Sequence, residues 1–396
     1  MLRAIIFDMD GVLVDSEPVH YKADKDMLKN EYSIDLDYEY YKQFIGGTTD
    51  NLWNTVIWNF HISGVNAAYL NSRADVYLEK MLEDKGYPAV SGVVPFVKKL
   101  KEETGLLFAV ASSSSMSKIN RNLKDLGLED CFEVKVSGQD IGKSKPDPGV
   151  FLEAAKQLGV ENSQCIVIED SMNGVLAASN ANMSCLGFIN ENSGKQDLSA
   201  ATALFESFEN LSFNYINMVY SHYVGEAATV LVTDRLRIRE IRLSDVENLY
   251  KLYEDEEITK YMPGLFETIE QEKEYTKNYI KNVYGFYHYG MWIIETLENN
   301  EIIGRVGVEN KSEVGIDYTH ELGYMIGKKY WRRGYGKEAA KAVIDFMDEE
   351  YDITDIFFEV KKENVSSCKL AIALGFELED KENETGYIIG RLKSSK

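Results

Sequence analysis

The sequence has few cysteines, and they are not grouped. Its 396 residues include four cysteines, which form no C-x-x-C motif. Three of the four lie in apolar surroundings, where we expect small core residues rather than metal ligands. A secreted disulfide scaffold is thereby excluded, and a reducing, cytoplasmic compartment is expected. The four are Cys131, Cys165, Cys185 and Cys368.

Long hydrophobic runs are also missing. The first apolar run is interrupted by Asp8, which makes it too short for a signal peptide. No stretch approaches the roughly 20 apolar residues that a membrane-spanning helix needs. We therefore expect no membrane partner.

Positive charge is scarce. The chain has 43 Lys and Arg against 65 Asp and Glu, a formal net charge of -22. Its densest basic groups, Lys143 with Lys145 and Arg332 with Arg333, are short. So acidic a chain repels phosphate backbones, and no nucleic-acid partner is expected. Metal binding or an amine substrate would suit the acidic charge, although solubility alone explains it equally well.

The length of the chain and the spacing of its apolar residues indicate two domains. Up to about residue 210, short apolar strands alternate with amphipathic helices, which predicts a Rossmann-like α/β core with a parallel sheet. A long insertion at about residues 16–88 is expected to form a helical cap. Strands are expected at residues 3–7, 106–111, 132–136 and 164–168, and helices at 93–103, 117–126 and 148–158.

The pattern of apolar residues changes after Thr229. Residues 211–229 are interpreted as a linker, in which 213–223 could form a connecting helix. Residues 230–396 are expected to form an α+β domain with a mixed sheet, because successive strands follow one another there. Those strands are expected at residues 236–241, 291–297, 301–310 and 320–327, with a helix at 245–258.

Reactive side chains follow the expected strands of the first half. Because parallel strands end at one edge of an open sheet, these side chains are expected to meet there. The lysine of a Lys-Pro dipeptide at the start of a helix is expected to join them. The residues are Asp8 and Asp10 after the first strand, Ser112 after the second, Glu169 and Asp170 after a later one, and Lys145.

This set of acids, one hydroxyl and one amine suits phosphoryl transfer. Asp8, Asp170 and Glu169 offer hard oxygen ligands for Mg²⁺, which would shield a phosphate from an attacking carboxylate. Ser112 and Lys145 could bind the other phosphate oxygens. One aspartate could act as nucleophile and another as general acid and base.

Four segments resemble, in this order, the four motifs of the haloacid dehalogenase superfamily of phosphohydrolases: FDMDGVLVDSEPVH, AVASSS, GKSKPDPGVF and IVIEDSMNGVLAA. The nearest group is that of β-phosphoglucomutase and related sugar-phosphate phosphatases. The resemblance covers about residues 1–210. It implies Asp8 as nucleophile, Asp10 as acid and base, Ser112 and Lys145 as phosphate binders, and a Mg²⁺ ion among Asp8, the Asp10 carbonyl, Glu169 and Asp170.

The cap segment FIGGTTD is similar to the substrate-specificity loop of that family. The resemblance places Gly46, Gly47 and Thr48 near a small phosphorylated substrate. His20 could line the hinge of the cap, or it could simply lie on a helix face. The mutase pattern prefers an arginine just after the loop, where this chain has Thr49 and Asp50. A phosphatase is therefore favoured, with a sugar-phosphate mutase as the alternative.

The second half contains a basic, glycine-containing loop between an expected strand and a long helix. A helix N-terminus presents free N–H groups and partial positive charge, so Arg332, Arg333, Gly334 and Gly336 indicate a pyrophosphate site. The loop is neither a P-loop nor a Rossmann fingerprint.

Three segments together resemble the GNAT acetyltransferases of the RimJ/RimL type, which acetylate amines with acetyl-CoA. They are TDRLRIREIRLSDVENLYKLYEDEEITKYM, ELGYMIGKKYWRRGYGKEA and ENVSSCKLAIALGF. The resemblance covers about residues 230–392. It implies that acetyl-CoA is held by Met325, Ile326, Arg332, Arg333, Gly334, Tyr335, Gly336 and Asn364, and that Ser367 protonates the departing thiolate.

Acetyl transfer also needs a base for the acceptor amine. Glu321, just before the cofactor strand, is the candidate, although a solvated glutamate at a strand edge is an equal alternative. The domain could instead be a non-catalytic acyl-CoA sensor, or acetylate protein N-termini rather than a small amine. The sequence thus predicts a bifunctional phosphatase and N-acetyltransferase.

Overall fold

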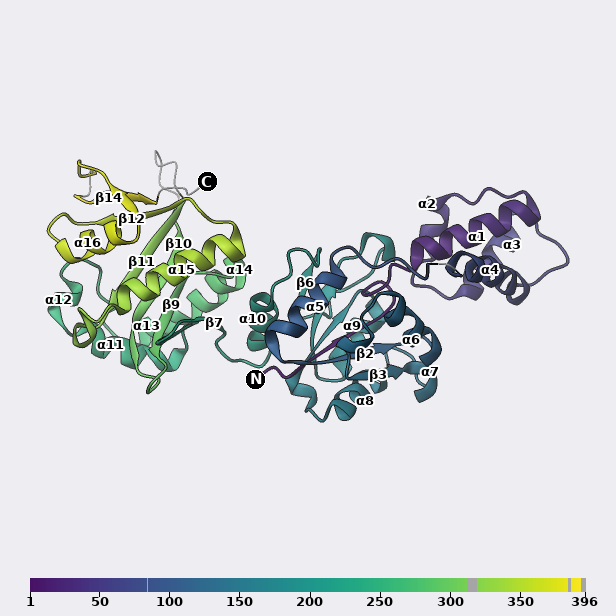
Figure 1. Ribbon diagram of the computed structural model, residues 1–396, viewed down its shortest axis with the longest axis horizontal. Coiled ribbons are helices and arrows are strands. Elements are labelled where there is room, and N and C mark those ends of the chain that lie inside the picture. Colours follow the sequence, from purple (N-terminus) through teal and green to yellow (C-terminus); the bar gives the residue numbers. More distant parts are fainter. Residues whose placement is uncertain (84, 312–318, 384–385, 393–396) are drawn as a thin grey trace. The chain divides into compact units, whose positions relative to one another are not determined.

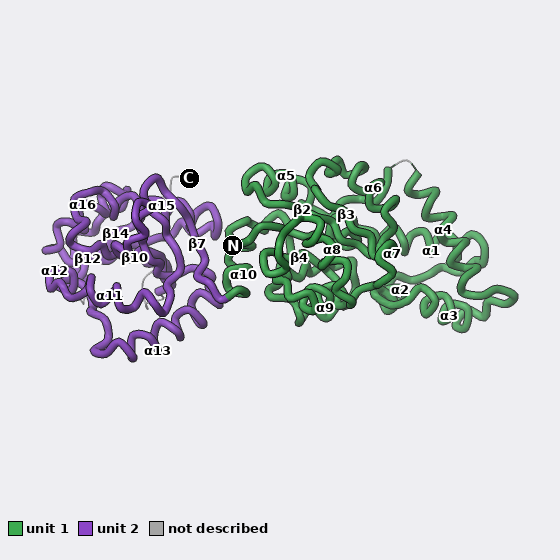
Figure 2. Tube along the Cα trace, turned by 90° about the horizontal axis from the view of Figure 1, so that it is seen from below, with its two compact units in different colours: residues 1–224 green, residues 225–396 purple. Residues whose placement is uncertain are grey.

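The computed structural model describes residues 1–83, 85–311, 319–383 and 386–392. The chain divides into two compact units, Met1–Val224 and Gly225–Lys396 (Figure 2). The boundary between the two units therefore falls inside the expected linker, residues 211–229. Its helix α10 (Phe213–Tyr223) packs on strand β5 (Ser184–Phe188) within unit 1.

Unit 1 is built on a parallel sheet (Figure 1). In the described residues its strand order is β3-β2-β1-β4-β5-β6, and every pairing is parallel. The central strand β1 is buried along its whole length, as its run of four apolar residues requires. The strands are β1 (Ala4–Phe7), β2 (Leu107–Ser112), β3 (Val134–Ser137), β4 (Cys165–Glu169), β5 (Ser184–Phe188) and β6 (Ala203–Phe205).

Alternate residues of β1 point to opposite faces of this sheet, so both faces need cover. Ala4 and Ile6 belong to an apolar cluster with residues of α8 (Gly149–Leu158) and α9 (Met172–Asn180). On the other face, Phe7 packs against the rings of Phe108 and Phe132. The remaining helices of this core are α5 (Val93–Thr104), α6 (Met116–Asp125) and α7 (Gly138–Ile141). This architecture confirms the predicted Rossmann-like core.

The insertion after β1 is a helical cap with its own core. Apolar residues of its helices, among them Met27, Trp53 and Leu70, form a separate buried cluster. The cap helices are α1 (Glu17–Tyr32), α2 (Tyr38–Tyr41), α3 (Thr49–Asn59) and α4 (Ala67–Leu82). The two connections to the core lie side by side, because Asp15 N donates to Pro88 O at 2.9 Å and Val90 N to Leu13 O at 3.2 Å.

Unit 2 is built on a mixed sheet of order β13-β14-β12-β11-β10-β9-β8-β7 in the described residues. The pairing of β11 with β12 is parallel and the other pairings are antiparallel. The strands are β7 (Thr229–Val232), β8 (Leu236–Arg239), β9 (Met291–Thr296), β10 (Ile302–Asn310), β11 (His320–Ile326), β12 (Ile356–Val360), β13 (Phe376–Leu378) and β14 (Ile388–Leu392). The predicted mixed sheet is thus confirmed.

Long helices cover this sheet. The helix α15 packs on β10 and β11, and its buried residues Ala339, Val343 and Met347 join the main core of the unit (Figure 1). None of the helices in the described parts of the chain combines the length and apolar character needed to cross a bilayer. The helices are α11 (Val246–Tyr253), α12 (Glu256–Thr259), α13 (Ile269–Tyr279), α14 (Gly285–Tyr287), α15 (Tyr335–Tyr351) and α16 (Val365–Ala373).

Candidate active sites

Strand register brings three acids together at one edge of the unit 1 sheet. Phe7 of β1 is paired with Ile168 of β4, so Asp8 and Glu169 follow at the same level. Asp8, Glu169 and Asp170 are buried, and each offers a carboxylate oxygen within 4.8 Å of the others. This is the edge that the sequence predicts, and the strand order reverses there between β1 and β4.

Lys145 lies between two of these acids. Its Nζ donates to Asp8 Oδ1 at 2.6 Å and to Glu169 Oε1 at 2.6 Å. The side chains of Lys145 and Asp8 are only 7% and 9% exposed, so these are buried ion pairs. One ammonium group faces three carboxylates, which leaves an excess of buried negative charge. A hard divalent cation such as Mg²⁺ fits this set of oxygen donors.

The pKa shifts of the clustered side chains agree with a site for a cation. Burial raises the pKa of Asp8 to about 7, although Lys145 opposes the shift. Burial and the neighbouring carboxylates of Glu169 and Asp8 also raise the pKa of Asp170 well above its ordinary value. Burial disfavours the ammonium of Lys145, but Asp8 and Glu169 outweigh this effect and raise its pKa. The acids therefore favour a proton or a cation.

Two glycines leave room for these acids. Gly11 adopts φ +78°, and a Cβ there would lie 1.9 Å from Asp170 Oδ2. A Cβ at Gly174 would lie 1.7 Å from Glu169 Oε1. The glycine of the Asp-x-Asp-Gly turn is thus required by its backbone conformation and by the carboxylate beside it.

Asp10 is not one of the three grouped carboxylates, although its charge helps to raise the pKa of Asp8. Its Oδ2 accepts a hydrogen bond from Ser114 Oγ at 3.0 Å. Ser112 is fully buried, and its Oγ accepts from Ser114 N at 3.0 Å. The sequence analysis did not single out Ser114. Nothing in a serine run indicates which hydroxyl will face an aspartate 104 positions away.

Loop residues after β5 also reach the site and were not predicted. Ser193 Oγ donates to Asp170 Oδ2, and Gln196 Nε2 donates to the Ser193 carbonyl at 2.8 Å. A Cβ at Gly46 would lie 2.6 Å from Gln196 Nε2, so the cap loop lies against this segment. The structure thereby connects the predicted specificity loop to Asp170 through Gln196 and Ser193.

The other predicted cap residues are placed as follows. Thr48 caps helix α3 by accepting from Asn51 N at 3.3 Å, and Gly47 N donates to Phe44 O at 2.9 Å. His20 Nε2 and Tyr87 Oη lie 3.1 Å apart, beside the connections of the cap. Burial lowers the pKa of His20, and Asp10 opposes the shift.

In unit 2, strands β11 and β12 diverge. They are paired at His320–Ile356 and Glu321–Phe357, while β11 continues to Ile326. The edge of β11 that carries Met325 and Ile326 therefore has no paired β12 residue among the described positions. Such an opening leaves an edge of the strand unpaired with a neighbouring strand, where an extended ligand can lie.

The predicted glycine loop leads from this opening into α15. Trp331 Nε1 donates to Ile326 O at 2.6 Å, and Arg332 adopts φ +61°. Gly334, with φ +83°, is the N-cap residue, so Tyr335 and Gly336 form the first turn of a 17-residue helix. The free N–H groups of this turn can bind an anion. Arg333 presents its carbonyl to Arg235 Nη1 at 3.1 Å.

A hydroxyl pair lies between β11 and α16. Tyr324 Oη and Ser367 Oγ are 2.8 Å apart, and burial raises the pKa of Tyr324. Asn364 caps α16 by accepting from Ser367 N at 3.2 Å. Sequence reasoning found Asn364 and Ser367 but missed Tyr324, since an alternating strand pattern gives no sign of which tyrosine meets a distant serine.

Glu321 lies at the last paired position of β11 and β12. Its Oε2 forms an ion pair with Lys311 Nζ at 3.2 Å, and Lys311 also donates to Glu359 at 2.8 Å. Burial raises the pKa of Glu321, while Lys311 opposes the shift. Glu309 is directly opposite Glu321 on β10, and its Oε1 accepts from Tyr279 Oη at 2.6 Å.

Comparisons with known proteins give a family for each unit. Residues 5–188 match the haloacid dehalogenase-like hydrolases, and residues 235–377 match the acetyltransferase (GNAT) domain. Hexitol phosphatase B of Escherichia coli is 33% identical over 189 residues, which cover 46% of this chain and 81% of that protein. A phosphorylated carbohydrates phosphatase of Thermotoga maritima is 28% identical over 218 residues, covering 53% and 97%.

A solved β-phosphoglucomutase of Clostridium difficile is 26% identical, with a TM-score of 0.45, and the match covers 57% of this chain and 100% of that one. Taken with the motif residues at the carboxyl edge of the sheet, the two family matches and the similarity to hexitol phosphatase B identify both halves. The chain belongs to the haloacid dehalogenase-like hydrolases through unit 1, and it carries a GNAT acetyltransferase domain in unit 2.

Proposed function

We propose that unit 1 is a Mg²⁺-dependent phosphatase of a small phosphorylated metabolite, with Asp8 as the nucleophile. The observation that carries the proposal is the convergence of Asp8, Glu169, Asp170 and Lys145 in one buried cluster. Two relatives are named as phosphatases of hexitols and of phosphorylated carbohydrates. A sugar phosphate or a sugar-alcohol phosphate is therefore the substrate class that we propose.

Asp8, Glu169 and Asp170 would hold the metal ion. When bound, Mg²⁺ would neutralise part of the charge on a phosphate, so that a carboxylate could approach the phosphorus atom. Lys145, whose ammonium group lies between Asp8 and Glu169, would bind a phosphate oxygen, and Ser112 would be a second phosphate binder.

Two steps complete the reaction. In the first, the Asp8 carboxylate attacks phosphorus while protonated Asp10 gives its proton to the departing alcohol oxygen. In the second, Asp10 removes a proton from water, the water oxygen attacks the phosphorus of the aspartyl-phosphate, and Asp8 leaves as a carboxylate. The products are the alcohol and inorganic phosphate.

The alternative for unit 1 is a sugar-phosphate mutase. The cap loop continues into Thr49 and Asp50, at the N-terminus of α3, and neither side chain can bind a second phosphate as an arginine would. A screen of sugar phosphates and hexitol phosphates should distinguish the two functions. A phosphatase releases inorganic phosphate without an activator, whereas a mutase requires a bisphosphate and releases little phosphate.

We further propose that unit 2 is an acetyl-CoA-dependent N-acetyltransferase. The divergence of β11 and β12 beside the N-terminus of α15 supports this function. The pantetheine arm would lie along the free edge at Met325 and Ile326, and the pyrophosphate would lie at the first turn that contains Tyr335 and Gly336. Arg332 and Arg333 would add positive charge.

The acceptor amine must be neutral before it attacks the thioester carbonyl. Glu321 is the candidate base, and its ion pair with Lys311 means that it would act directly only after that contact opens. The attack forms an amide and releases the thiolate of CoA, which takes a proton from the Tyr324 and Ser367 hydroxyl pair.

Acetyl-CoA binding and acetyl transfer should be measured separately, since an acyl-CoA sensor would bind without transferring. Isothermal titration measures the first, and CoA release with amine and peptide panels measures the second. Transfer to small amines supports a metabolite acetyltransferase, transfer to peptides alone indicates a protein N-terminal acetyltransferase, and binding without transfer contradicts the proposal.

A further inference from the structure

Unit 2 contains a half-buried arginine that has no counter-ion. Arg305 lies within β10, and no carboxylate of the described residues reaches its guanidinium at ion-pair distance. The buried Arg239 of β8 shows the usual arrangement, because it donates to Glu295 at 2.7 Å and to Asp245 at 2.7 Å. Since an arginine does not lose its proton, Arg305 keeps a positive charge that the described residues leave uncompensated.

The neighbours of Arg305 are mainly phenols, and most of these are committed to other partners. Burial disfavours the charged form of Arg305, whereas the surrounding groups raise its pKa; they are Tyr253, Tyr284, Tyr279 and Glu309. Tyr279 Oη donates to Glu309 at 2.6 Å, and Tyr284 Oη donates to a backbone carbonyl. Tyr253 is left as a hydrogen-bond neighbour of the guanidinium, and as a neutral phenol it cannot balance the charge.

Part of the guanidinium is open to a ligand. Its Nε is enclosed by protein and has no hydrogen-bond partner in the described chain, but Nη1 and Nη2 do not share this enclosure. These two nitrogens carry four of the five N–H donors of an arginine, and a single phenol oxygen cannot accept all of them. The remaining N–H groups can donate to the oxygens of a carboxylate or a phosphate.

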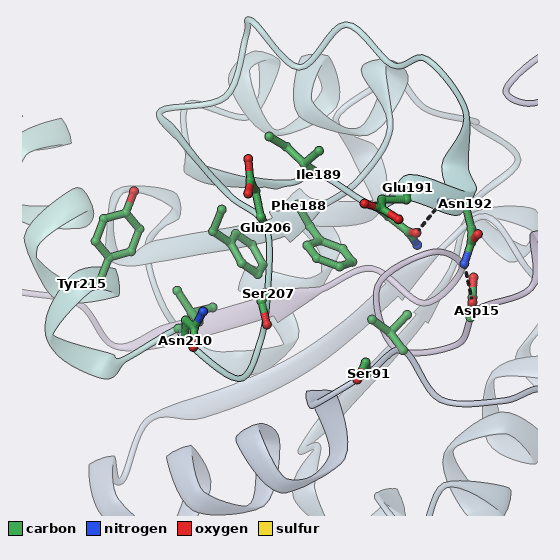
Figure 3. A pocket seen from close by; sticks show the side chains of 14 residues that line it. Asp15, Ser91, Phe188, Ile189, Glu191, Asn192, Glu206, Ser207, Asn210 and Tyr215 are labelled. Atoms are coloured by element: carbon green, nitrogen blue, oxygen red, sulfur yellow. Dashed lines mark hydrogen bonds between the residues drawn. The ribbon is translucent and has the colours of Figure 1, made fainter. Parts of the chain in front are cut away.

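The carboxylate of Asp15 in unit 1 is the opposite case. Asp15 lines a cavity of about 770 Å³ beside the connections of the cap, and its Oδ2 accepts from Asn192 Nδ2 at 2.7 Å (Figure 3). Its Oδ1 has no partner within the part of the protein that the structure describes, but it is enclosed, so no ligand in that cavity can reach it. Of these two groups, Arg305 is the one that a bound ligand can neutralise.

Strand register places Arg305 beside the proposed site of acetyl transfer. Arg305 is paired with Met325 of β11, and Glu309 is paired with Glu321, in the same antiparallel ladder. Alternate residues of a strand share one face, so these four side chains lie on the same face of the sheet. Met325 belongs to the strand edge proposed for the pantetheine arm, and Glu321 is the candidate base. Four strand residues span about 13 Å, so one small molecule can extend from Arg305 toward Glu321.

We propose, on the basis of the acetyltransferase function given above, that Arg305 binds an anionic group of the acetyl acceptor. The acceptor of unit 2 is then an amine that also carries a carboxylate or a phosphate. Its anionic group pairs with the Nη groups of Arg305, and its amine lies toward the thioester and Glu321. An amine without an anionic group would leave the charge of Arg305 uncompensated in the complex, and such acceptors are therefore disfavoured.

Matched pairs of acceptors test the site in transfer assays of the full chain. β-Alanine is compared with n-propylamine, and O-phosphoethanolamine with ethanolamine, in EDTA so that unit 1 does not remove the phosphate. In at least one pair the anionic member should have a kcat/KM about tenfold or more above its partner, and that pair distinguishes carboxylate from phosphate. Arg305→Gln should remove most of this preference by raising KM, whereas Arg305→Lys, which keeps the charge, should lose less.

Binding measured without turnover separates this site from the acetyltransferase function. With CoA present, saturation-transfer NMR should give a Kd for the anionic probe that Arg305→Gln weakens by about tenfold or more, while the Kd for acetyl-CoA changes by less than about threefold. An unchanged Kd for acetyl-CoA also shows that the variant is folded. Arg237→Gln is the matched control and should preserve both values, because that guanidinium is already paired with Glu295.

The outcomes are distinct. Binding of an anionic probe that depends on Arg305, with no transfer to any amine, would support the anion site and contradict the acetyltransferase function. Transfer with equal kcat/KM within both pairs would support the acetyltransferase function and overturn the anion site. A loss in Arg305→Gln that is the same for acceptors with and without the anionic group would also overturn it, since a merely structural arginine predicts that result.

Discussion

Lys145 donates a hydrogen bond to Asp8 at 2.6 Å across 137 positions of sequence. Both side chains are nearly inaccessible to water, and the same ammonium group contacts Glu169. This contact joins the motif that contains Asp8 to the motif that contains Lys145, so the fold brings together two residues that the proposed chemistry needs. It also shows that the acids of the cluster outnumber the positive charge available to them.

Replacement of Lys145 should impair phosphatase activity strongly. Lys145→Ala removes a phosphate ligand and the cation that balances Asp8, so kcat/KM should fall by about a hundredfold or more. Lys143→Ala is the control, since that side chain is 61% exposed and is paired with Asp147. Initial rates of phosphate release measure both variants, and similar losses in the two would contradict the role of Lys145.

Removal of divalent metal should abolish the phosphatase and destabilise unit 1. Mg²⁺ should restore turnover and raise the Tm of this unit, because it reduces the repulsion among Asp8, Glu169 and Asp170. Asp170→Asn should reduce the rise in Tm, whereas Asp197→Asn, at an exposed position, should not. A Tm that does not respond to Mg²⁺ in the wild type would contradict the metal site.

The stability of unit 1 should depend on Asp24 in the cap. Burial raises the pKa of Asp24 to about 8, with contributions from Glu17 and Asp75, and Tyr41 is also close to it. The folded state holds this proton more tightly than the unfolded state does. Stability is therefore lost as pH rises from the ordinary pKa of an aspartate toward about 8.

Asp24→Asn should thus stabilise unit 1 at alkaline pH. We expect a gain on the order of 2 kcal/mol larger at about pH 8 than at about pH 5, measured by denaturant unfolding monitored within unit 1. Asp26→Asn, on the same helix, serves as the control and should show a smaller difference. An effect of Asp24→Asn that is the same at both pH values would contradict the shifted pKa.

The hydroxyl pair of unit 2 should affect transfer more than binding. Tyr324→Phe and Ser367→Ala each remove one member of a pair whose oxygens are 2.8 Å apart. We expect kcat for acetyl transfer to fall by about ten- to a hundredfold in each variant, while the Kd for acetyl-CoA changes by less than about threefold. Unchanged kcat in both would exclude the pair as the proton donor to the thiolate.

The sequence predicted the elements that carry strong local patterns. The expected strands at residues 3–7 and 164–168 correspond to β1 and β4, and the helix expected at 213–223 is α10. Local patterns also placed Asp8 and Glu169 at strand ends, where the parallel register brings them level. Periodicity and motif order are sufficient for such features.

Contacts between distant segments could not be predicted in the same way. Ser193 reaches Asp170, and Tyr324 meets Ser367, although neither serine nor tyrosine carries a local signal of such a partner. The assignment of α10 to unit 1 depends on its packing against β5, which a linker-like composition does not indicate. These features arise from tertiary packing, which a single sequence specifies only indirectly.

The most direct test of the phosphatase account is detection of a phosphoryl group on Asp8. The Asp10→Asn variant, which should form the aspartyl-phosphate but hydrolyse it slowly, would be mixed with a hexitol phosphate and Mg²⁺ and quenched in acid. Peptide mass spectrometry should find the mass of one phosphoryl group on the peptide that contains Asp8, and find none when Asp8→Asn is added to the variant. Phosphate release by the wild type with no label on this peptide, or a label that persists without Asp8, would contradict the account.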